Sequence, residues 1–183
     1  SENFEGPTEK NIQARLRGML LYTRSNQINS MVVNTSNKSE LAVGYSTQYG
    51  DSVGAISLLG DLYKSEVFCL ARYINKKFNQ LIPEQIIERP PTAELRENQT
   101  DEQSLPPYEE LDAILEGFLS YRYDLEGLVK AGFEREKVQK VLELYRKSEY
   151  KRYQFCPILK INSKSFGFGY RIPLSKDSRF YIK

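Results

Sequence analysis

Histidine is absent from the 183-residue sequence. Its absence excludes histidine-based catalytic triads, histidine proton shuttles and histidine-ligated metal sites within these residues. The two cysteines, Cys69 and Cys156, form no CxxC metal motif and have no ligand partner nearby in sequence. We interpret them as reduced thiols of a cytoplasmic protein. Any chemistry here must therefore use lysine, arginine, carboxylates, hydroxyls, amides or backbone groups.

Long apolar runs and an excess of charge of one sign are also missing. No segment approaches the ~20 apolar residues that a membrane span needs, and the first five residues have neither the basic nor the apolar region of a secretory signal. The net charge is only +2, so electrostatics give no reason to expect nucleic acid or a membrane surface as a partner. With 40% hydrophobic and 27% charged residues, the composition is that of a soluble globular domain with a core.

Helical periodicity dominates the chain. The first helix places Ile12, Leu16, Met19 and Leu20 on one face. Asp61 is the expected N-cap of the second helix. The expected helices span residues 8–27, 63–78, 108–120, 124–131 and 135–150. Residues 88–107 have no periodicity and are expected to form a long loop, and the tail after residue 151 is expected to be extended.

One convincing strand stands among these helices. Met31-Val32-Val33-Asn34 has the composition of a buried parallel strand. Asn37 and Glu40 then have capping-box spacing for a short helix, and residues 44–60 are expected to form a shaped, glycine-rich loop. A parallel strand needs neighbours. The domain is therefore either helical or part of a larger α/β sheet.

Residues 34–40 follow the strand and open a helix, which is where open α/β sheets bind ligands. Thr35 is placed to hydrogen-bond a nucleotide, and Glu40 is placed to hold magnesium together with phosphate oxygens. The alternative is that Glu40 is only the glutamate of the capping box. Spacing alone leaves both interpretations open.

Several further polar residues are candidates for binding anions. Lys64 lies in the first turn of a helix, where a cation costs roughly 0.3–1 kcal/mol unless an anion binds beside the helix amides. Arg15 lies near the polar face of its helix and suits bidentate binding of phosphate or carboxylate. Lys151 follows a helix C-terminus, where cations are expected anyway. Thr92 lies in the long loop, and such loops often close over a site. A solvated surface position is the alternative for each of them.

In order along the chain, these residues belong to a series of motifs that resembles the NAD+ synthetases. The series runs from about residue 11 to about residue 175. It comprises Asn-Ile-Gln-Ala-Arg at 11–15, Asn-Lys-Ser-Glu at 37–40, Gly-Tyr at 44–45, Tyr-Gly-Asp at 49–51, Asp-Leu-Tyr-Lys at 61–64, Pro-Thr-Ala-Glu-Leu-Arg at 91–96, Gln-Thr-Asp at 99–101, Pro-Tyr-x-x-Leu-Asp at 107–112 and Glu-Tyr-Lys-Arg at 149–152. Ser36-Asn37 stands where ammonia-dependent members have an Asp-His pair, so the chain looks more like the glutamine-dependent subtype.

The resemblance implies an α/β domain with the Rossmann-like parallel sheet of the adenine-nucleotide hydrolases, of which residues 1–183 would be a helix-rich C-terminal portion. It implies a ligase that adenylates deamido-NAD+ with ATP and Mg2+ and then amidates it with ammonia from glutamine, giving NAD+, AMP and pyrophosphate. It also implies a homo-oligomer. By this resemblance deamido-NAD+ would contact Asn11, Arg15, Glu40, Tyr45 and Lys151, ATP would contact Thr35, Lys64 and Thr92, and Glu40 would serve the metal. It assigns no catalytic nucleophile to this chain.

Two parts of the family pattern are not found between residues 1 and 183. They are the Ser-Gly-Gly-x-Asp-Ser pyrophosphate loop and the glutaminase domain with its catalytic cysteine. Gln48 and Ala55 also stand where ammonia-dependent members carry a lysine and an aspartate for deamido-NAD+. We therefore expect residues 1–183 alone to be inactive and to need the missing synthetase and glutaminase portions. The alternative is a non-catalytic helical interaction or oligomerisation module derived from the synthetase. A different ATP pyrophosphatase fits the fold but not the motif series.

Overall fold

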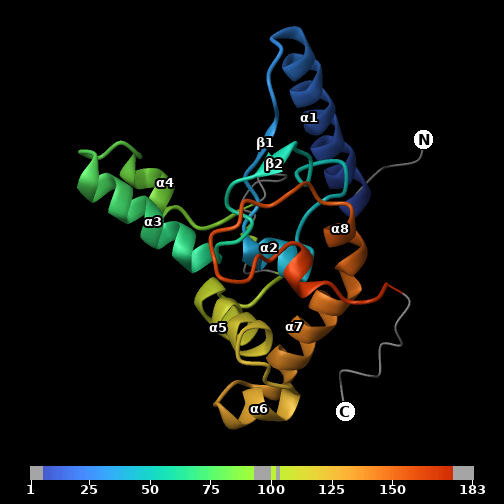
Figure 1. Cartoon of the computed structure of the whole chain (residues 1–183), viewed down its shortest axis with the longest axis vertical. Helices are drawn as coiled ribbons and strands as arrows, with labels where there is room; N and C mark the ends of the chain where they lie inside the picture. Colours follow the sequence, from blue (N-terminus) through green and yellow to red (C-terminus); the bar gives the residue numbers. More distant parts are fainter. Residues whose placement is uncertain (1–5, 93–99, 102–103, 175–183) are drawn as a thin grey trace.

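The computed structural model describes residues 6–92, 100–101 and 104–174. Within them, helices surround a very small parallel sheet (Figure 1). The elements in order are α1 (Pro7–Gln27), β1 (Val33–Asn34), α2 (Lys38–Val43), β2 (Ile56–Ser57), α3 (Lys64–Lys77), α4 (Glu84–Glu88), α5 (Tyr108–Leu119), α6 (Leu125–Lys130), α7 (Arg135–Lys147), α8 (Glu149–Tyr153) and the 3-10 helix η2 (Phe168–Tyr170). No helix in the described part of the chain is both long and apolar enough to cross a bilayer.

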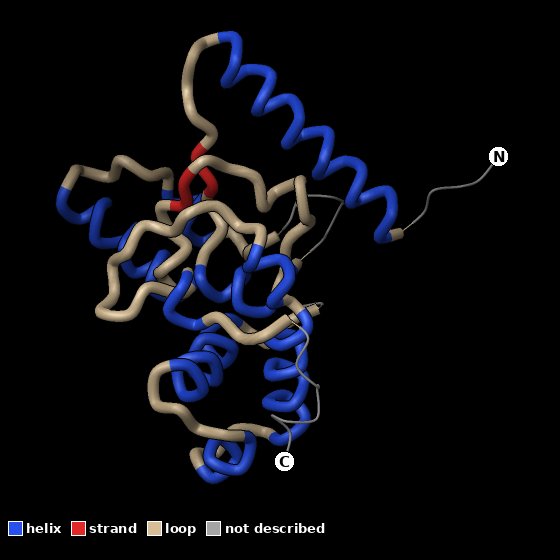
Figure 2. The backbone as a smooth tube through the Cα atoms, turned by 45° about the vertical axis from the view of Figure 1, so that its right-hand side comes forward, coloured by secondary structure: helices blue, strands red, loops and turns tan. Residues whose placement is uncertain are grey.

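The sheet pairs β1 with β2 in parallel (Figure 2). Ile158 adds a parallel bridge to Ser57. Two expectations from the sequence are wrong here. The strand is shorter than residues 31–34 and only half buried, because Met31 is 66% and Val33 45% exposed. The stretch 44–60 is also not all loop, since it contains β2. Both strands are only two residues long, too short to show a period of two in sequence.

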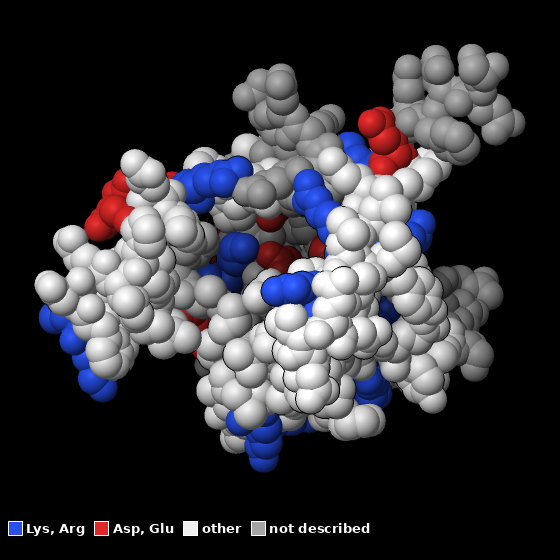
Figure 3. All heavy atoms as spheres, turned by 90° about the horizontal axis from the view of Figure 1, so that it is seen from above, with Lys and Arg blue, Asp and Glu red and all other residues white. Residues whose placement is uncertain are grey.

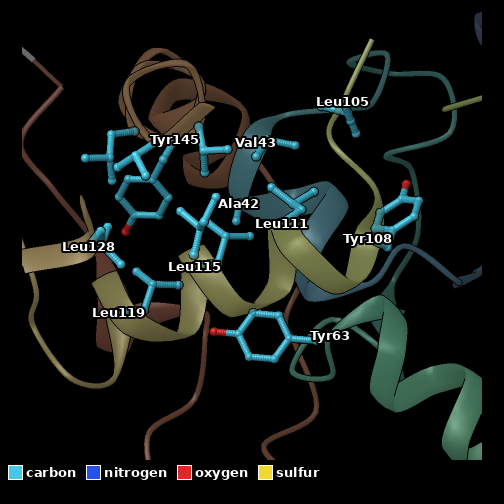
Figure 4. Close-up of a cluster of buried hydrophobic side chains, with 14 of the residues drawn as sticks. Ala42, Val43, Tyr63, Leu105, Tyr108, Leu111, Leu115, Leu119, Leu128 and Tyr145 are labelled. Atoms are coloured by element: carbon cyan, nitrogen blue, oxygen red, sulfur yellow. The ribbon is translucent and has the colours of Figure 1, made fainter. Parts of the chain in front are cut away.

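The core lies below the sheet, where α2, α5, α6 and α7 pack together (Figure 4). Helix α5 buries one stripe completely, with Leu111, Ile114 and Leu115 at the i, i+3, i+4 spacing of a helix face. Helix α7 presents Val138 and Val141 to it, also fully buried. Each such side chain contributes about 1.5–3 kcal/mol of hydrophobic stabilisation. The six-residue helix α2 is held in the centre of this cluster.

Helix α1 confirms the helix expected over 8–27, but its apolar face lies outside this core. Ile12, Leu16, Met19 and Leu20 are 42–63% exposed, whereas Ala14 is buried. Helices α3 and α4 form an arm that projects from the opposite side of the molecule (Figure 1). None of the described side chains of α3 is fully buried. Helix α3 contacts α5 and α2, and α4 packs on α3 and buries Ile87.

The expected N-cap of α3 is wrong, since the helix is capped at Tyr63. The buried carboxylate of Asp61 instead accepts hydrogen bonds from the backbone amides of Ile161, Asn162 and Phe166, each at 2.8 Å. Because Asp61 faces a segment a hundred residues away, local sequence offered no sign of this contact. The tail is consequently tied to the start of α3.

The helix expected over 135–150 is interrupted. It ends at Lys147, and α8 begins two residues later after Ser148. The Ser148 hydroxyl bonds the carbonyl oxygens of Leu144 at 2.6 Å and of Ala42 in α2 at 3.0 Å, and a serine that competes for helix carbonyls favours a bend. The tail after residue 151 is likewise not wholly extended, because it holds the end of α8 and η2.

Candidate functional site

The loop 44–50 is held from three directions. Lys151 of α8 donates from Nζ to the carbonyl oxygens of Gly44 at 2.7 Å and Ser46 at 2.6 Å. Burial lowers the pKa of this ammonium. From α1, Arg15 donates from Nε to the carbonyl oxygen of Gln48 at 3.2 Å. A further contact joins the Thr47 hydroxyl to the Asn11 amide oxygen at 2.8 Å. The structure thus brings together around one loop the residues expected to bind the dinucleotide.

Small residues allow this close approach. Gly44 ends α2 in the left-handed conformation, with φ of 68°, and a Cβ there would lie 2.3 Å from the Cβ of Ser148. A Cβ on Gly50 would lie 2.8 Å from the Cβ of Ala14. The loop therefore rests directly on α1 and on the start of α8, and larger residues at these positions would push it away.

Glu40 serves two contacts at once. Its Oε2 accepts from the Asn37 backbone amide at 3.2 Å, while Asn37 caps the Glu40 amide in return, which confirms the expected capping box. Its Oε1 pairs with Nζ of Lys64 at 3.1 Å, and both side chains are about one-fifth exposed. The capping role and a role in charge recognition are compatible, because each uses a different oxygen.

The start of α3 is already supplied with an anion by the protein. Asp112 of α5 accepts from the Ser65 amide at 2.9 Å and from the Ser39 hydroxyl, and that hydroxyl accepts from the Lys64 amide at 2.9 Å. The backbone amides of Lys64 and Ser65 therefore have their acceptors within the fold. The Lys64 ammonium, which carries the charge, points elsewhere, to Glu40.

Tyr45 and Tyr108 link the Glu40–Lys64 pair to the neighbouring loops. The Tyr45 amide donates to the Glu40 carbonyl oxygen at 2.9 Å, which joins the loop 44–50 to α2. Tyr108 lies with its ring 5.3 Å from Nζ of Lys64 and donates from its hydroxyl to Asp101 at 2.8 Å. Burial, together with the charges of Glu40 and Asp101, raises the pKa of Tyr108. Its phenol is therefore neutral and serves as a hydrogen-bond donor.

Thr92 and Thr35 occupy different places relative to this centre. The Asp101 amide donates to the Pro91 carbonyl oxygen at 3.0 Å, so the two ends of the long loop meet beside Tyr108, and half-buried Thr92 follows directly. Residues 93–99 and 102–103 lie outside the described part of the chain. Exposed Thr35 instead lines a cavity of about 240 Å3 with Val32, Gly50 and other residues. The structure does not join Thr35 to the Glu40–Lys64 pair.

Seen from above, the molecule has a hollowed face with both acidic and basic side chains inside it (Figure 3). Opposite charges at the floor of a concave surface suit a ligand that carries phosphates and a cation. Among the described residues, no group of three or more acidic or cysteine side chains lies close enough to hold a metal by itself.

Two residues of the site escaped sequence reasoning. Lys38 is buried with Nζ 4.1 Å from the Tyr63 ring centre, and Phe166 and Tyr170 of the tail complete an aromatic cage. Arg152, 7% exposed, donates to the Ala42 carbonyl oxygen at the end of α2 at 2.6 Å. Lys38 belongs to the motif 37–40 with the candidate Glu40, and Arg152 belongs to the motif 149–152 with the candidate Lys151. Membership of these motifs could have identified both residues, whereas helical spacing could not.

Comparison with known proteins decides the family. A profile described as NAD synthase matches residues 1–155. The chain belongs to the NAD synthase family. It is 44% identical over 169 residues to the glutamine-dependent NAD(+) synthetase of Thermotoga maritima, which covers 92% of this chain but 29% of that protein. The chain therefore spans less than a third of that relative's length.

Two solved structures resemble this chain in fold. The NH3-dependent NAD synthetase from Campylobacter jejuni is 31% identical, with a TM-score of 0.64, and the match covers 87% of this chain and 58% of that one. An NMN synthetase from Francisella tularensis is 30% identical, with a TM-score of 0.63, and the match covers 84% and 55%. The matched parts of those proteins therefore share the fold of this chain.

Proposed function

We propose that these residues form part of the synthetase site of a glutamine-dependent NAD+ synthetase, within a Rossmann-like parallel-sheet domain. The reaction is adenylation of the nicotinate carboxylate of deamido-NAD+ by ATP, which releases pyrophosphate, followed by attack of ammonia, which releases AMP and leaves NAD+. Family membership supports the proposal. The observation that carries it for this chain is the Glu40–Lys64 pair, joined to the loop 44–50 through Tyr45.

Lys64 is the residue to which we assign the ATP phosphates. Its ammonium is one-fifth exposed and lies beside a single carboxylate and the face of Tyr108, so it is positioned without being consumed by several partners. Negative charge builds on phosphate oxygens as pyrophosphate leaves, and a preorganised cation stabilises that charge. Thr92 and Thr35 are the further ATP contacts of this proposal, from the long loop and from the end of β1.

Glu40 fits a magnesium ion that is bound chiefly by substrate. Mg2+ in nucleotide sites usually takes one or two carboxylates, phosphate oxygens and waters. Each Glu40 oxygen has one partner and retains a second lone pair, so a single-carboxylate site is compatible with the geometry. Such an ion neutralises phosphate charge when bound.

The dinucleotide half of the site is assigned to the loop 44–50 and its supports. Asn11, Arg15 and Lys151 each hold this loop, and Lys151 uses two of its three donors on backbone carbonyls. We propose that the remaining donors of Arg15 and Lys151, with Tyr45 and Glu40, contact deamido-NAD+. Loss of any one of these supports would then displace the loop and change the shape of the whole pocket.

Pyrophosphate exchange tests the proposal in the complete protein that carries this sequence. Lys64→Met should reduce deamido-NAD+-dependent exchange of labelled pyrophosphate into ATP by about 100-fold or more, the usual effect of removing one charge-stabilising donor. Lys147→Met is the matched control, because Lys147 is 68% exposed and pairs only with Glu143 one helical turn away. Wild-type exchange in Lys64→Met would refute the assignment.

Substrate and assembly are tested separately. Comparing deamido-NAD+ with nicotinate mononucleotide distinguishes a dinucleotide synthetase from one that resembles the mononucleotide enzyme. Residues 1–183 alone, supplied with ATP, magnesium, deamido-NAD+ and ammonium, should show no sustained turnover.

We also propose that the protein is cytoplasmic and homo-oligomeric, and light scattering measures its mass. Self-association without a thermal shift on adding ATP or deamido-NAD+ would favour the interaction-module alternative, since a ligand at about 100 times its Kd adds about 2.7 kcal/mol.

A further inference from the structure

A second cavity, of about 430 Å3, lies between α8 and the tail, and neither Glu40 nor Lys64 lines it. Its walls are mainly aromatic and aliphatic. They include Leu41, Tyr153, Phe155, Ile158, Phe166 and Phe168. The volume falls in the range of sites for small organic molecules, about 300–1,000 Å3. None of the residues assigned above to ATP, magnesium or deamido-NAD+ lines this cavity.

Two arginines provide the charge in this cavity, and they share one carboxylate. Arg152 pairs with Oε2 of Glu149 at 2.8 Å, and Arg171 approaches Oε1 of the same glutamate at 3.7 Å. Both arginines line the cavity, whereas no aspartate or glutamate does. The group of Glu149, Arg152 and Arg171 therefore carries a net charge of +1 beside an apolar space, which favours an anionic ligand over a neutral one.

The unused hydrogen-bond donor belongs to Arg171. Arg152 donates to Glu149, to backbone carbonyls of α2 and α7, and to the Ser148 hydroxyl. By contrast, Nη1 of Arg171 and Oε1 of Glu149 are buried and have no hydrogen-bond partner in the described structure. A separation of 3.7 Å is too long for a hydrogen bond. Because Nη1 itself is buried, an acceptor in the cavity would bind the other guanidinium donors of Arg171, whose side chain is 26% exposed.

Aromatic rings flank the same guanidinium. Its carbon lies 5.4 Å from the ring centre of Tyr153 and 5.6 Å from that of Phe168. The site thus offers one cationic donor at the end of a lipophilic cavity, a combination that recognises a carboxylate with an apolar body.

We propose that this cavity binds a small monoanionic carboxylic acid with an aromatic or branched aliphatic body. Its carboxylate accepts from the accessible guanidinium donors of Arg171 and balances the excess charge, while its apolar part replaces water against Phe155, Ile158 and Phe166. The inference does not depend on the proposed function.

Cys156 provides a reporter, because this half-buried thiol lines the cavity and exposed Cys69 lies elsewhere, on α3. The complete protein is treated with the neutral thiol reagent 4,4′-dithiodipyridine, and modification of each cysteine is followed by mass spectrometry. Since burial raises the pKa of Cys156, the reaction is run at alkaline pH. The probes are 4-phenylbutyrate and its neutral amide at up to about 10 mM, which suits affinities in the millimolar range.

We expect 4-phenylbutyrate to slow modification of Cys156 at least about fivefold, the amide to have little effect, and Cys69 to be unchanged, because the charged group carries the recognition. Arg171→Gln should abolish the protection, and Arg171→Lys should restore part of it. Lys147→Gln removes an equal charge from the surface of α7 and should change nothing. The circular dichroism and melting temperature of each variant show that it folds.

Three outcomes would overturn the proposal. They are no protection of Cys156 by the carboxylate, equal protection by acid and amide, and undiminished protection in folded Arg171→Gln. If Arg171→Gln fails to fold, the decision falls to the acid–amide comparison in the wild-type protein and to Arg171→Lys.

Discussion

The attachment of the tail to Asp61 predicts a large effect from a nearly isosteric substitution. The Asp61 carboxylate is fully buried. Its Oδ2 accepts from the amides of Ile161 and Asn162, and its Oδ1 accepts from the amide of Phe166. Asp61→Asn keeps the shape but turns one acceptor oxygen into an NH2 donor. An asparagine oxygen can still serve two of these amides, so one buried amide must face a second donor.

The magnitude follows from the bond that is lost. A hydrogen bond to a charged acceptor is worth about 1.5–3 kcal/mol, and a buried donor left without an acceptor adds to the cost. We expect Asp61→Asn to lower the free energy of unfolding by about 2–4 kcal/mol, or the melting temperature by roughly 5–15 °C for a domain of this size. Amide hydrogen exchange at Ile161, Asn162 and Phe166 should accelerate more than exchange in α5 and α7.

Asp124→Asn is the matched control. Asp124 caps α6 through one bond to the Gly127 amide at 2.8 Å, and asparagine is an equally good N-cap, so we expect a change below about 0.5 kcal/mol. Melting curves and hydrogen-exchange mass spectrometry measure both variants. If Asp61→Asn melts within about 1 °C of the wild type, or tail exchange is unchanged, the carboxylate does not anchor the tail and the reasoning is wrong.

Three other substitutions test neighbouring contacts. Gly44→Ala should cost about 2–4 kcal/mol in a urea titration, because it combines a left-handed backbone with a clash against Ser148, and Gly132→Ala, with φ of 104° but open space around its Cβ position, should cost less. Burial lowers the pKa of Lys38 in the folded protein below its ordinary 10.5. Between the folded and the unfolded pKa the unfolded chain binds more protons, so the free energy of unfolding rises with pH towards 10. Lys38→Met should flatten that rise in unfolding curves measured from pH about 8 to 10, and an unaltered slope would contradict the burial argument. Lys151→Met removes both hydrogen bonds to the loop 44–50 and should increase amide hydrogen exchange in this loop, as measured by mass spectrometry. It should not slow refolding of the core.

Local patterns predicted the parts of the fold that depend on local forces. The helical period located α1, α5 and α6, and the spacing of Asn37 and Glu40 located the cap of α2. The same patterns failed where a distant partner decides. The period of α1 identified an apolar face but not what covers it, and it remains exposed here. The pairing of β1 with β2 and the break at Ser148 also depend on contacts between segments far apart in sequence.

The candidate site shows the same division. The residue types suited to phosphate and metal were visible at Glu40 and Lys64, and the structure places these two in contact. The sequence could not show that Asp112, 48 residues after Lys64, accepts from the Ser65 amide at the start of α3, or that the Ser39 hydroxyl accepts from the Lys64 amide. Buried Lys38 was missed for a related reason, because a lysine is normally assumed to be solvated.

Three consecutive residues of α2 explain why distant changes should reach the site. Lys38 faces the aromatic cage formed by Tyr63 and two rings of the tail. Ser39 bonds Asp112 and the start of α3, and Glu40 pairs with Lys64. Successive residues of a helix point about 100° apart, so one short helix can contact three separate segments. A helix of six residues has little stability of its own and depends on such tertiary contacts. Releasing the tail at Lys38 therefore shifts the same backbone that positions Glu40. In Lys38→Met, Kd for ATP in the complete protein should rise even though Lys38 touches none of the residues assigned to ATP.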